Sequence, residues 1–225
     1  MPALPMPALR LKTKLVFAIT GMVLVIVATL SSVYIREVVK LRLQETGEDG
    51  EFIGEEIFDV ARPSLESDLS KSNVNLNDPL QVEDAIADVL QTDRGLTALL
   101  DSVIGWSLTI QDASISGIDG RALVHTRPAL VGKTIKRRED FASIAHANIW
   151  KQLGVIYGPA QVYDVRVPFS RNDIPFGEVR VGISTVLLKR SIQPILTRSL
   201  IFSGVSILVC LVVAAGLSNL ALRPL

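Results

Sequence analysis

The stretch YDVRVPFSRNDIPFGEVRVGIS, residues 163–184, decides the fold of this 225-residue chain. Apolar and polar side chains alternate in each half of it, a pattern that predicts two half-buried strands. The polar pair Asn172-Asp173 lies between the halves and predicts the turn of an antiparallel hairpin. Beyond residue 184 the pattern becomes helical, so the second strand leads into a helix.

The charges of this hairpin predict its register, because directly opposed residues point to the same face of a sheet. One register places Arg166 opposite Glu178 and Asp164 opposite Arg180. A slip by two residues instead places Arg166 opposite Arg180, which is repulsive. We therefore expect the first register, with two cross-strand ion pairs.

Two apolar stretches without a charged residue lie near the ends of the chain, at residues 15–35 and 200–222. As helices that rise about 1.5 Å per residue, both are long enough to cross a bilayer core of about 30 Å. The segment between them has the composition of a soluble domain and must fold on one side of the membrane. We expect a membrane-anchored domain between two transmembrane helices.

The first apolar stretch begins after basic residues but is longer than a signal-peptide core and lacks a cleavage pattern, so we expect an uncleaved anchor. Basic residues lie on both sides of it, so charge alone does not orient the chain. Because long loops are translocated largely regardless of charge, we expect cytoplasmic termini and an outside domain. The single cysteine, Cys210, lies in the second apolar stretch and cannot form a disulfide within the chain.

The remaining pattern predicts an α+β domain with an antiparallel sheet. The first helix continues past the membrane to about residue 70, and Gly47, Gly50 and Gly54 predict a break or kink in it. A polar loop is expected at residues 71–79. The other expected elements are a helix over 79–104, strands at 106–111 and 121–126, a turn at 116–120, a helix over 139–153 and a short strand at 155–157.

Three segments resemble a known family. GRALVHTRP at 120–128, followed by VGK at 131–133, is similar to the second strand and loop of single Cache domains, which are PAS-like extracytoplasmic sensors. FGEVRVGIS at 176–184 resembles their last strand. LRPL at 222–225, directly after the second apolar stretch, is similar to the opening of a HAMP linker.

This resemblance implies the input half of a bacterial transmembrane receptor in the plasma membrane, most often a sensor histidine kinase of a two-component system. The sensor would be periplasmic or extracellular. The alternatives are the input half of a chemotaxis receptor or nucleotide cyclase, or a stand-alone membrane-anchored binding protein. The implied segments are a cytoplasmic N-terminus (1–14), transmembrane helix 1 (15–35), the Cache-like sensor (36–198), transmembrane helix 2 (199–222) and the start of a HAMP-like linker (223–225).

No enzyme signature is found in the sequence, so we expect a chain without a catalytic domain, without a cofactor and without a metal centre. Balanced charge, with 23 basic and 23 acidic residues, gives no reason to expect nucleic acid as a partner. The expected partners are the lipid bilayer, an unidentified small-molecule or ionic ligand, and a second copy of the chain. Small residues in the second apolar stretch, such as Ser203, Gly204, Ser206 and Gly216, would allow close helix pairing.

Six residues are candidates for ligand binding, each with a plainer alternative. His125 would look from its strand into a pocket with aromatic walls, although a histidine at the edge of the core fits as well. Two strand arginines would bind a carboxylate, although the expected register makes them ion-pair partners. The candidates are His125, Trp150, Tyr157, Tyr163, Arg166 and Arg180.

Two charged clusters have both a functional and a plain interpretation. A basic loop would meet an anion or lipid headgroups, or would simply be solvated, which we favour. An acidic tract after the first apolar stretch would attract divalent cations, or would be a hydrated helix face, which we favour because its spacing fits no known cation loop. The clusters are Arg127, Lys133, Arg137 and Arg138, and Glu45, Glu48, Asp49, Glu51, Glu55, Glu56 and Asp59.

Overall fold

The computed structural model describes residues 11–69, 79–171 and 174–221. The chain divides into two units. The two ends, Met1–Val38 and Gln193–Leu225, form one unit, and Val39–Ile192 forms the other. The N-terminal residues before Leu11, the expected turn at Asn172-Asp173, nearly all of the expected loop at 71–79 and the HAMP-like segment 222–225 lie outside the described residues.

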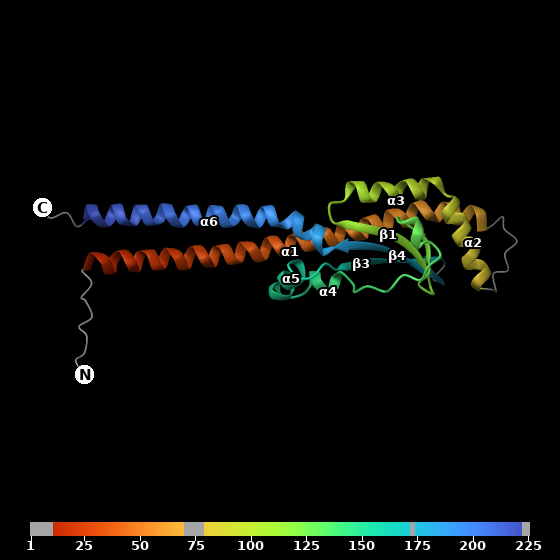
Figure 1. Ribbon diagram of the computed structural model, residues 1–225, viewed down its shortest axis with the longest axis horizontal. Coiled ribbons are helices and arrows are strands. Elements are labelled where there is room, and N and C mark those ends of the chain that lie inside the picture. Colours follow the sequence, from red (N-terminus) through yellow and green to blue (C-terminus); the bar gives the residue numbers. More distant parts are fainter. Residues whose placement is uncertain (1–10, 70–78, 172–173, 222–225) are drawn as a thin grey trace, which may run out of the picture. The chain divides into compact units, whose positions relative to one another are not determined.

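Figure 1 labels most of the helices and strands of the chain. In chain order they are α1 (Leu11–Leu69), α2 (Pro79–Thr92), α3 (Arg94–Trp106), β1 (Ile110–Gly117), β2 (Ala122–His125), the short 3-10 helix η1 (Pro128–Leu130), α4 (Ala142–Ala145), α5 (Ile149–Ile156), β3 (Val162–Arg171), β4 (Ile174–Ser184) and α6 (Thr185–Ala221).

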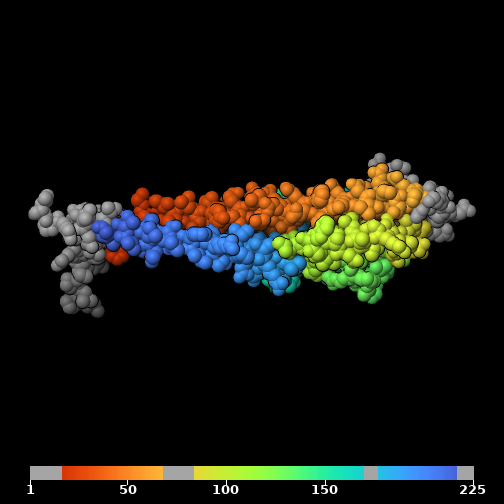
Figure 2. Space-filling view, turned by 90° about the horizontal axis from the view of Figure 1, so that it is seen from above, coloured from red at the N-terminus to blue at the C-terminus, as the bar shows by residue number. Residues whose placement is uncertain are grey.

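The unit formed by the chain ends contains the two apolar stretches, which lie in α1 and α6. Within these helices, Phe17–Ser67 and Thr185–Gly216 are long and apolar enough to cross a membrane. The two helices lie side by side along their apolar parts (Figures 1 and 2). A hydrogen bond joins them, with 2.8 Å between the hydroxyl oxygens of Ser31 and Ser203. Membrane anchoring by two helices is therefore supported by length and composition.

The second unit is an α+β domain, as expected. Its four strands form one antiparallel sheet in the order β2-β1-β4-β3. The two central strands, β1 and β4, are far apart in the sequence and pair with each other. Strand β4 therefore lies inside the sheet, with neighbours on both sides.

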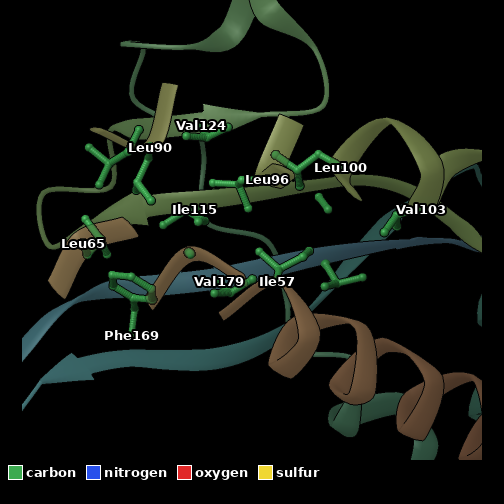
Figure 3. Close-up of a cluster of buried hydrophobic side chains, with 14 of the residues drawn as sticks. Ile57, Leu65, Leu90, Leu96, Leu100, Val103, Ile115, Val124, Phe169 and Val179 are labelled. Atoms are coloured by element: carbon green, nitrogen blue, oxygen red, sulfur yellow. The ribbon is translucent and has the colours of Figure 1, made fainter. Parts of the chain in front are cut away.

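One face of the sheet packs against helices to form the hydrophobic core (Figure 3). In α1, Ile57 is fully buried against the face that carries Ile115 and Val179. Helices α2 and α3 add Leu90, Leu96 and Leu100 to the same cluster. Because strand side chains alternate, the residues between these apolar positions lie on the opposite face.

The expected break in the first helix is wrong, because α1 is continuous from Leu11 to Leu69. Its glycines allow close approach to the sheet instead. A Cβ atom at Gly54 would lie 2.7 Å from Cγ2 of Val167, and one at Gly50 would lie 3.0 Å from Cγ2 of Val165. The glycines thus let α1 pack its backbone against β3, at some cost in helix propensity.

The single helix expected over 79–104 is also wrong, since Asp93 separates α2 from α3. The Asp93 carboxylate accepts hydrogen bonds from the backbone N–H groups of Gly95 (2.8 Å) and Leu96 (3.1 Å), which is N-capping of α3. The cap lets each short helix place its own apolar face on the core.

Three further boundaries differ from expectation. The strand expected at 106–111 is β1, Ile110–Gly117, because Trp106 still belongs to α3. The helix expected over 139–153 is two helices, and Asn148 caps the second by accepting from the N–H of Lys151 at 2.8 Å. The short strand expected at 155–157 does not form, since α5 continues to Ile156. The strand expected at 121–126 is confirmed as β2.

The hairpin of β3 and β4 is confirmed, but its expected register is wrong. Val167 pairs with Val179, and Arg166 lies directly opposite Arg180. The two guanidinium groups find different partners, so the repulsion is avoided. Arg180 reaches diagonally to Asp164, while Arg166 donates to the backbone carbonyl of Arg138. Long side chains reach diagonal neighbours, and the expected register had counted only directly opposite ones.

Candidate functional site

The polar face of the sheet carries two buried carboxylates on either side of a glycine. Gly182 of β4 pairs with Asp112 of β1 on one side and with Asp164 of β3 on the other. Both aspartates are almost completely buried, with 3% and 0% of their surface exposed. Burying two carboxylates side by side is very unfavourable without cations, so the arginines around them determine whether the site can form.

Two arginines neutralise these carboxylates. Arg138, from the loop before α4, binds Asp112 with both terminal nitrogens at 2.7 and 3.0 Å and reaches Asp164 at 3.2 Å. Arg180 of β4 donates from Nε to Asp164 at 2.9 Å and from Nη2 to the carbonyl of Lys136 at 3.1 Å. We call Asp112, Arg138, Asp164 and Arg180 the ion-pair cluster.

Gly182 provides the space in which the ion-pair cluster assembles. A Cβ atom at this position would lie 2.2 Å from Oδ1 of Asp112 and 2.5 Å from Nη1 of Arg138. Any side chain here would displace the charged groups. The cluster therefore rests directly on the backbone of the central strand β4.

A third arginine, Arg127, binds the cluster from the solvent side. Its Nη2 lies 2.9 Å from Oδ2 of Asp112, and half of its side chain is exposed. Burial alone would raise the pKa of the Asp112 carboxyl, but the hydrogen bond and charge of Arg138, with the charge of Arg127, hold this pKa below its usual value. Asp112 is therefore ionised at neutral pH.

His125 lies beside the cluster, at the end of β2, and is 5% exposed. Its Nδ1 accepts a hydrogen bond from the backbone N–H of Arg127 at 2.8 Å, so this nitrogen carries no proton. Burial lowers the pKa of the imidazole, Asp112 opposes this effect, and nearby arginines strengthen it. His125 is a neutral histidine at the edge of the cluster.

The aromatic residues expected to wall a pocket around His125 are not gathered there. Trp150 is 80% exposed, and Tyr157 is half exposed with the Lys189 ammonium 4.9 Å from its ring centre. Tyr163 is buried and donates to Oε1 of Gln161 at 2.6 Å. His125 lies on the edge strand β2 and Tyr163 on the opposite edge strand β3. Three strand spacings of about 4.8 Å separate these edges.

Arg166 and Arg180, by contrast, lie side by side. The expected ion pair between Asp164 and Arg180 is confirmed, while the one between Arg166 and Glu178 is wrong, because Arg166 donates to the Arg138 carbonyl. Among the described residues, the buried Nε of Arg166 has no hydrogen-bond partner. The loop that carries Arg138 is therefore held by both arginines of the hairpin.

A groove of about 570 Å³ opens beside the cluster, where β1 ends and β4 begins. Arg180 and Glu178 line it from the sheet, and Lys136 and Arg137 line it from the loop. Three cations and two carboxylates, Glu178 and Asp119, line this groove, so its charge balance is positive by one. It is the part of the site into which a small charged molecule fits.

Sequence reasoning missed Asp112 and Gly182 and placed Arg138 in a solvated loop. A carboxylate among the buried residues of β1 was the available signal for Asp112, but its partners depend on the pairing of β1 with β4. The acidic tract lies along α1, and the described residues contain no group of three or more metal-binding side chains.

The chain was compared with families and proteins that are already known. No protein-family model, curated protein or solved structure matches it.

Proposed function

We propose that this chain is the signal-receiving input module of a bacterial transmembrane receptor, anchored in the plasma membrane by two helices with its sheet domain outside the cell or in the periplasm. In this proposal the domain is Cache-like, two copies pair, and the output is a cytoplasmic histidine kinase. A chemotaxis receptor or nucleotide cyclase would use the same input.

The observation that carries this proposal is the course of β4. This strand holds Arg180 and Gly182 at the ion-pair cluster, ends at Ser184, and is followed without a gap by α6, which begins at Thr185. The membrane-crossing part of α6 therefore belongs to the same continuous segment as the cluster. A rearrangement at the cluster has a short covalent route to the membrane.

The groove beside Arg180 is the proposed ligand site. Its positive balance favours a small anionic ligand. Such a ligand would compete with Asp164 and Glu178 for the guanidinium of Arg180, and binding would shift the domain between two states only by its difference in affinity for them.

The test is a hybrid receptor in which residues 1–221 precede the output half of a characterised sensor kinase, assayed by autophosphorylation in membrane vesicles. Arg127→Gln removes the half-exposed ion pair between Arg127 and Asp112. A pair of this kind contributes up to about 1 kcal/mol, so its loss should change kinase activity by about twofold to fivefold. Lys151→Gln, at an exposed site on α5, is the matched control and should change nothing.

A second hybrid carries two additional glycines after Gln193, within α6. These should interrupt the helix and abolish the effect of Arg127→Gln. An effect that persists in this hybrid would exclude α6 as the route. Equal activity of the Arg127→Gln, Lys151→Gln and parent hybrids would argue for a membrane-anchored binding protein that sends no signal.

A further inference from the structure

The two apolar helices enclose a groove of about 560 Å³ on one side of their contact. Leu30 and Tyr34 of α1 line it opposite Arg198, Phe202 and Ser206 of α6. It lies wholly within the unit formed by the two chain ends. The hydrogen-bonded hydroxyls of Ser31 and Ser203 also face it and tie the two helices together there.

The groove is polar at one end and apolar at the other. Tyr34 is the next-to-last residue of the charge-free stretch 15–35, and Arg198 precedes the stretch 200–222 by two residues. Both therefore lie where the hydrocarbon core meets the headgroups, which is where tyrosine and arginine are favoured. From Arg198 to Ser206 the groove extends about 12 Å along α6, into the hydrocarbon.

Among the described residues of this unit, Arg198 has no counter-ion. Its side chain is exposed, and within the described part of the chain it forms no hydrogen bond or ion pair. The only acidic residue in the segments 11–38 and 193–221 is Glu37, which does not line the groove. A cation at the headgroup level without a protein partner is complementary to an anionic headgroup.

We propose that this groove binds one anionic phospholipid from the leaflet on the side of the sheet domain. Arg198 and the Tyr34 hydroxyl would hold the phosphate, and an acyl chain would lie against Leu30 and Phe202. This inference is independent of the proposed signalling role.

A membrane helix from a second copy is a poorer occupant. In a two-fold symmetric pair whose axis is parallel to the membrane normal, the same surface of each copy meets at the same depth. That arrangement would bring Arg198 towards its own counterpart, with no acidic residue in the groove to separate them. The phosphate of an anionic lipid would pair with the charge of Arg198, which a second copy of the chain would leave unpaired.

The experiment uses the full chain in nanodiscs of phosphatidylcholine containing a minor fraction of phosphatidylglycerol. After gentle release, native mass spectrometry counts the retained lipids of each kind. We expect one retained phosphatidylglycerol per chain. Arg198→Gln should reduce its retention about fivefold, the usual contribution of one basic residue at an anionic surface. Ser206→Phe should also reduce retention, by filling the apolar end.

Arg36→Gln is the matched control, since Arg36 lies near the same boundary but does not line the groove. Equal losses in Arg36→Gln and Arg198→Gln would mean unspecific attraction and would overturn the proposal. If glycerol phosphate alone displaced the lipid, the acyl chain would not contribute to binding, and a lipid-specific groove would be overturned. A change from dimer to monomer in Ser206→Phe, with lipid retention unaltered, would assign the groove to a second copy.

Discussion

At the scale of single residues, the ion-pair cluster makes Asp164 a sensitive position. Asp164→Asn leaves Arg180, only 4% exposed, without its nearest and buried carboxylate partner. Breaking a buried pair by removing one partner costs about 3–5 kcal/mol. We expect a loss of that size in the free energy of unfolding, measured by urea denaturation of the full chain in detergent with circular dichroism.

The control for this prediction is Glu178→Gln. Glu178 lies 3.7 Å from Nε of Arg180, and its side chain is 32% exposed. A partly exposed pair of this kind contributes less than about 1 kcal/mol. If both variants lost equally little stability, water would be replacing the Asp164 carboxylate as a partner of Arg180. The ion-pair cluster would then be accessible to solvent.

His125 makes the stability of the domain depend on pH. Its folded-state pKa is lowered, so below a pH of about 6.5 the unfolded chain binds a proton that the folded chain resists. This contribution to stability is complete above that pH and is lost as the pH falls through the lowered folded-state pKa. Asp112, Arg127, Arg138 and Arg180 are the charged groups that act on the imidazole.

Urea denaturation at pH 7.5 and at pH 5 tests this expectation. The parent should lose stability between these values, and His125→Asn, which keeps an acceptor without a titrating group, should lose less. The lowered pKa of Asp112 acts below this window, because a carboxylate with a depressed pKa stays ionised throughout it. An identical pH dependence in both proteins would show that His125 does not titrate there.

At the scale of elements, the sequence predicted where most helices and strands lie but not how they pair. Alternation in residues 163–184 was sufficient for the hairpin. Its register depends on Arg180 reaching diagonally to Asp164 and on Gly182 leaving room for Arg138, a residue some forty positions away in the chain. Charge pairing within the hairpin cannot reveal a partner supplied by a distant loop. For the same reason the sequence named Arg180 as a site residue and missed Asp112.

Helix α1 provides a test of why its glycines are present. A Cβ atom at Gly54 would lie 2.7 Å from Val167, whereas one at Gly47 would lie 3.5 Å from the Phe141 ring, an ordinary contact. Both changes to alanine gain about 1 kcal/mol of helix propensity. Overpacking of about 1–3 kcal/mol opposes the gain only at Gly54. Gly47→Ala should therefore be the more stable variant in thermal unfolding.

The opposite explanation, in which the glycines weaken the helix to allow a break, predicts a different result. Both alanine variants would then gain similar stability. A difference of about 1–3 kcal/mol in favour of Gly47→Ala would confirm close packing of α1 on β3 as the reason for Gly54.

At the scale of the whole molecule, composition was the strongest guide. Two charge-free stretches indicated the two helices that are long and apolar enough to cross a membrane, and the change from helical to alternating patterns indicated an α+β domain. The continuity of α1 was hidden because Gly47, Gly50 and Gly54 have low helix propensity, which tertiary packing against β3 overrides. Local propensity is a weak guide wherever a long helix lies on a sheet.

Topology is the remaining prediction at this scale. Two crossings place both termini on the same side of the membrane, and a long intervening segment is translocated largely regardless of its charge. We expect the domain to lie outside the cytoplasm. Ser143→Cys, an exposed position in α4, in a Cys210→Ala background provides one reactive thiol in the domain. A membrane-impermeant maleimide should label it in bacterial cells whose inner membrane is intact.

Epitope tags at the two ends complete the measurement. Both tags should resist protease until the inner membrane is permeabilised, because they lie on the side opposite to the labelled thiol. Protection of the thiol with accessible tags would invert the chain and leave the domain in the cytoplasm. One protected and one accessible tag would mean a single crossing, which conflicts with the paired helices joined by Ser31 and Ser203. The three outcomes therefore separate an external sensor from an internal domain and from a single-pass anchor.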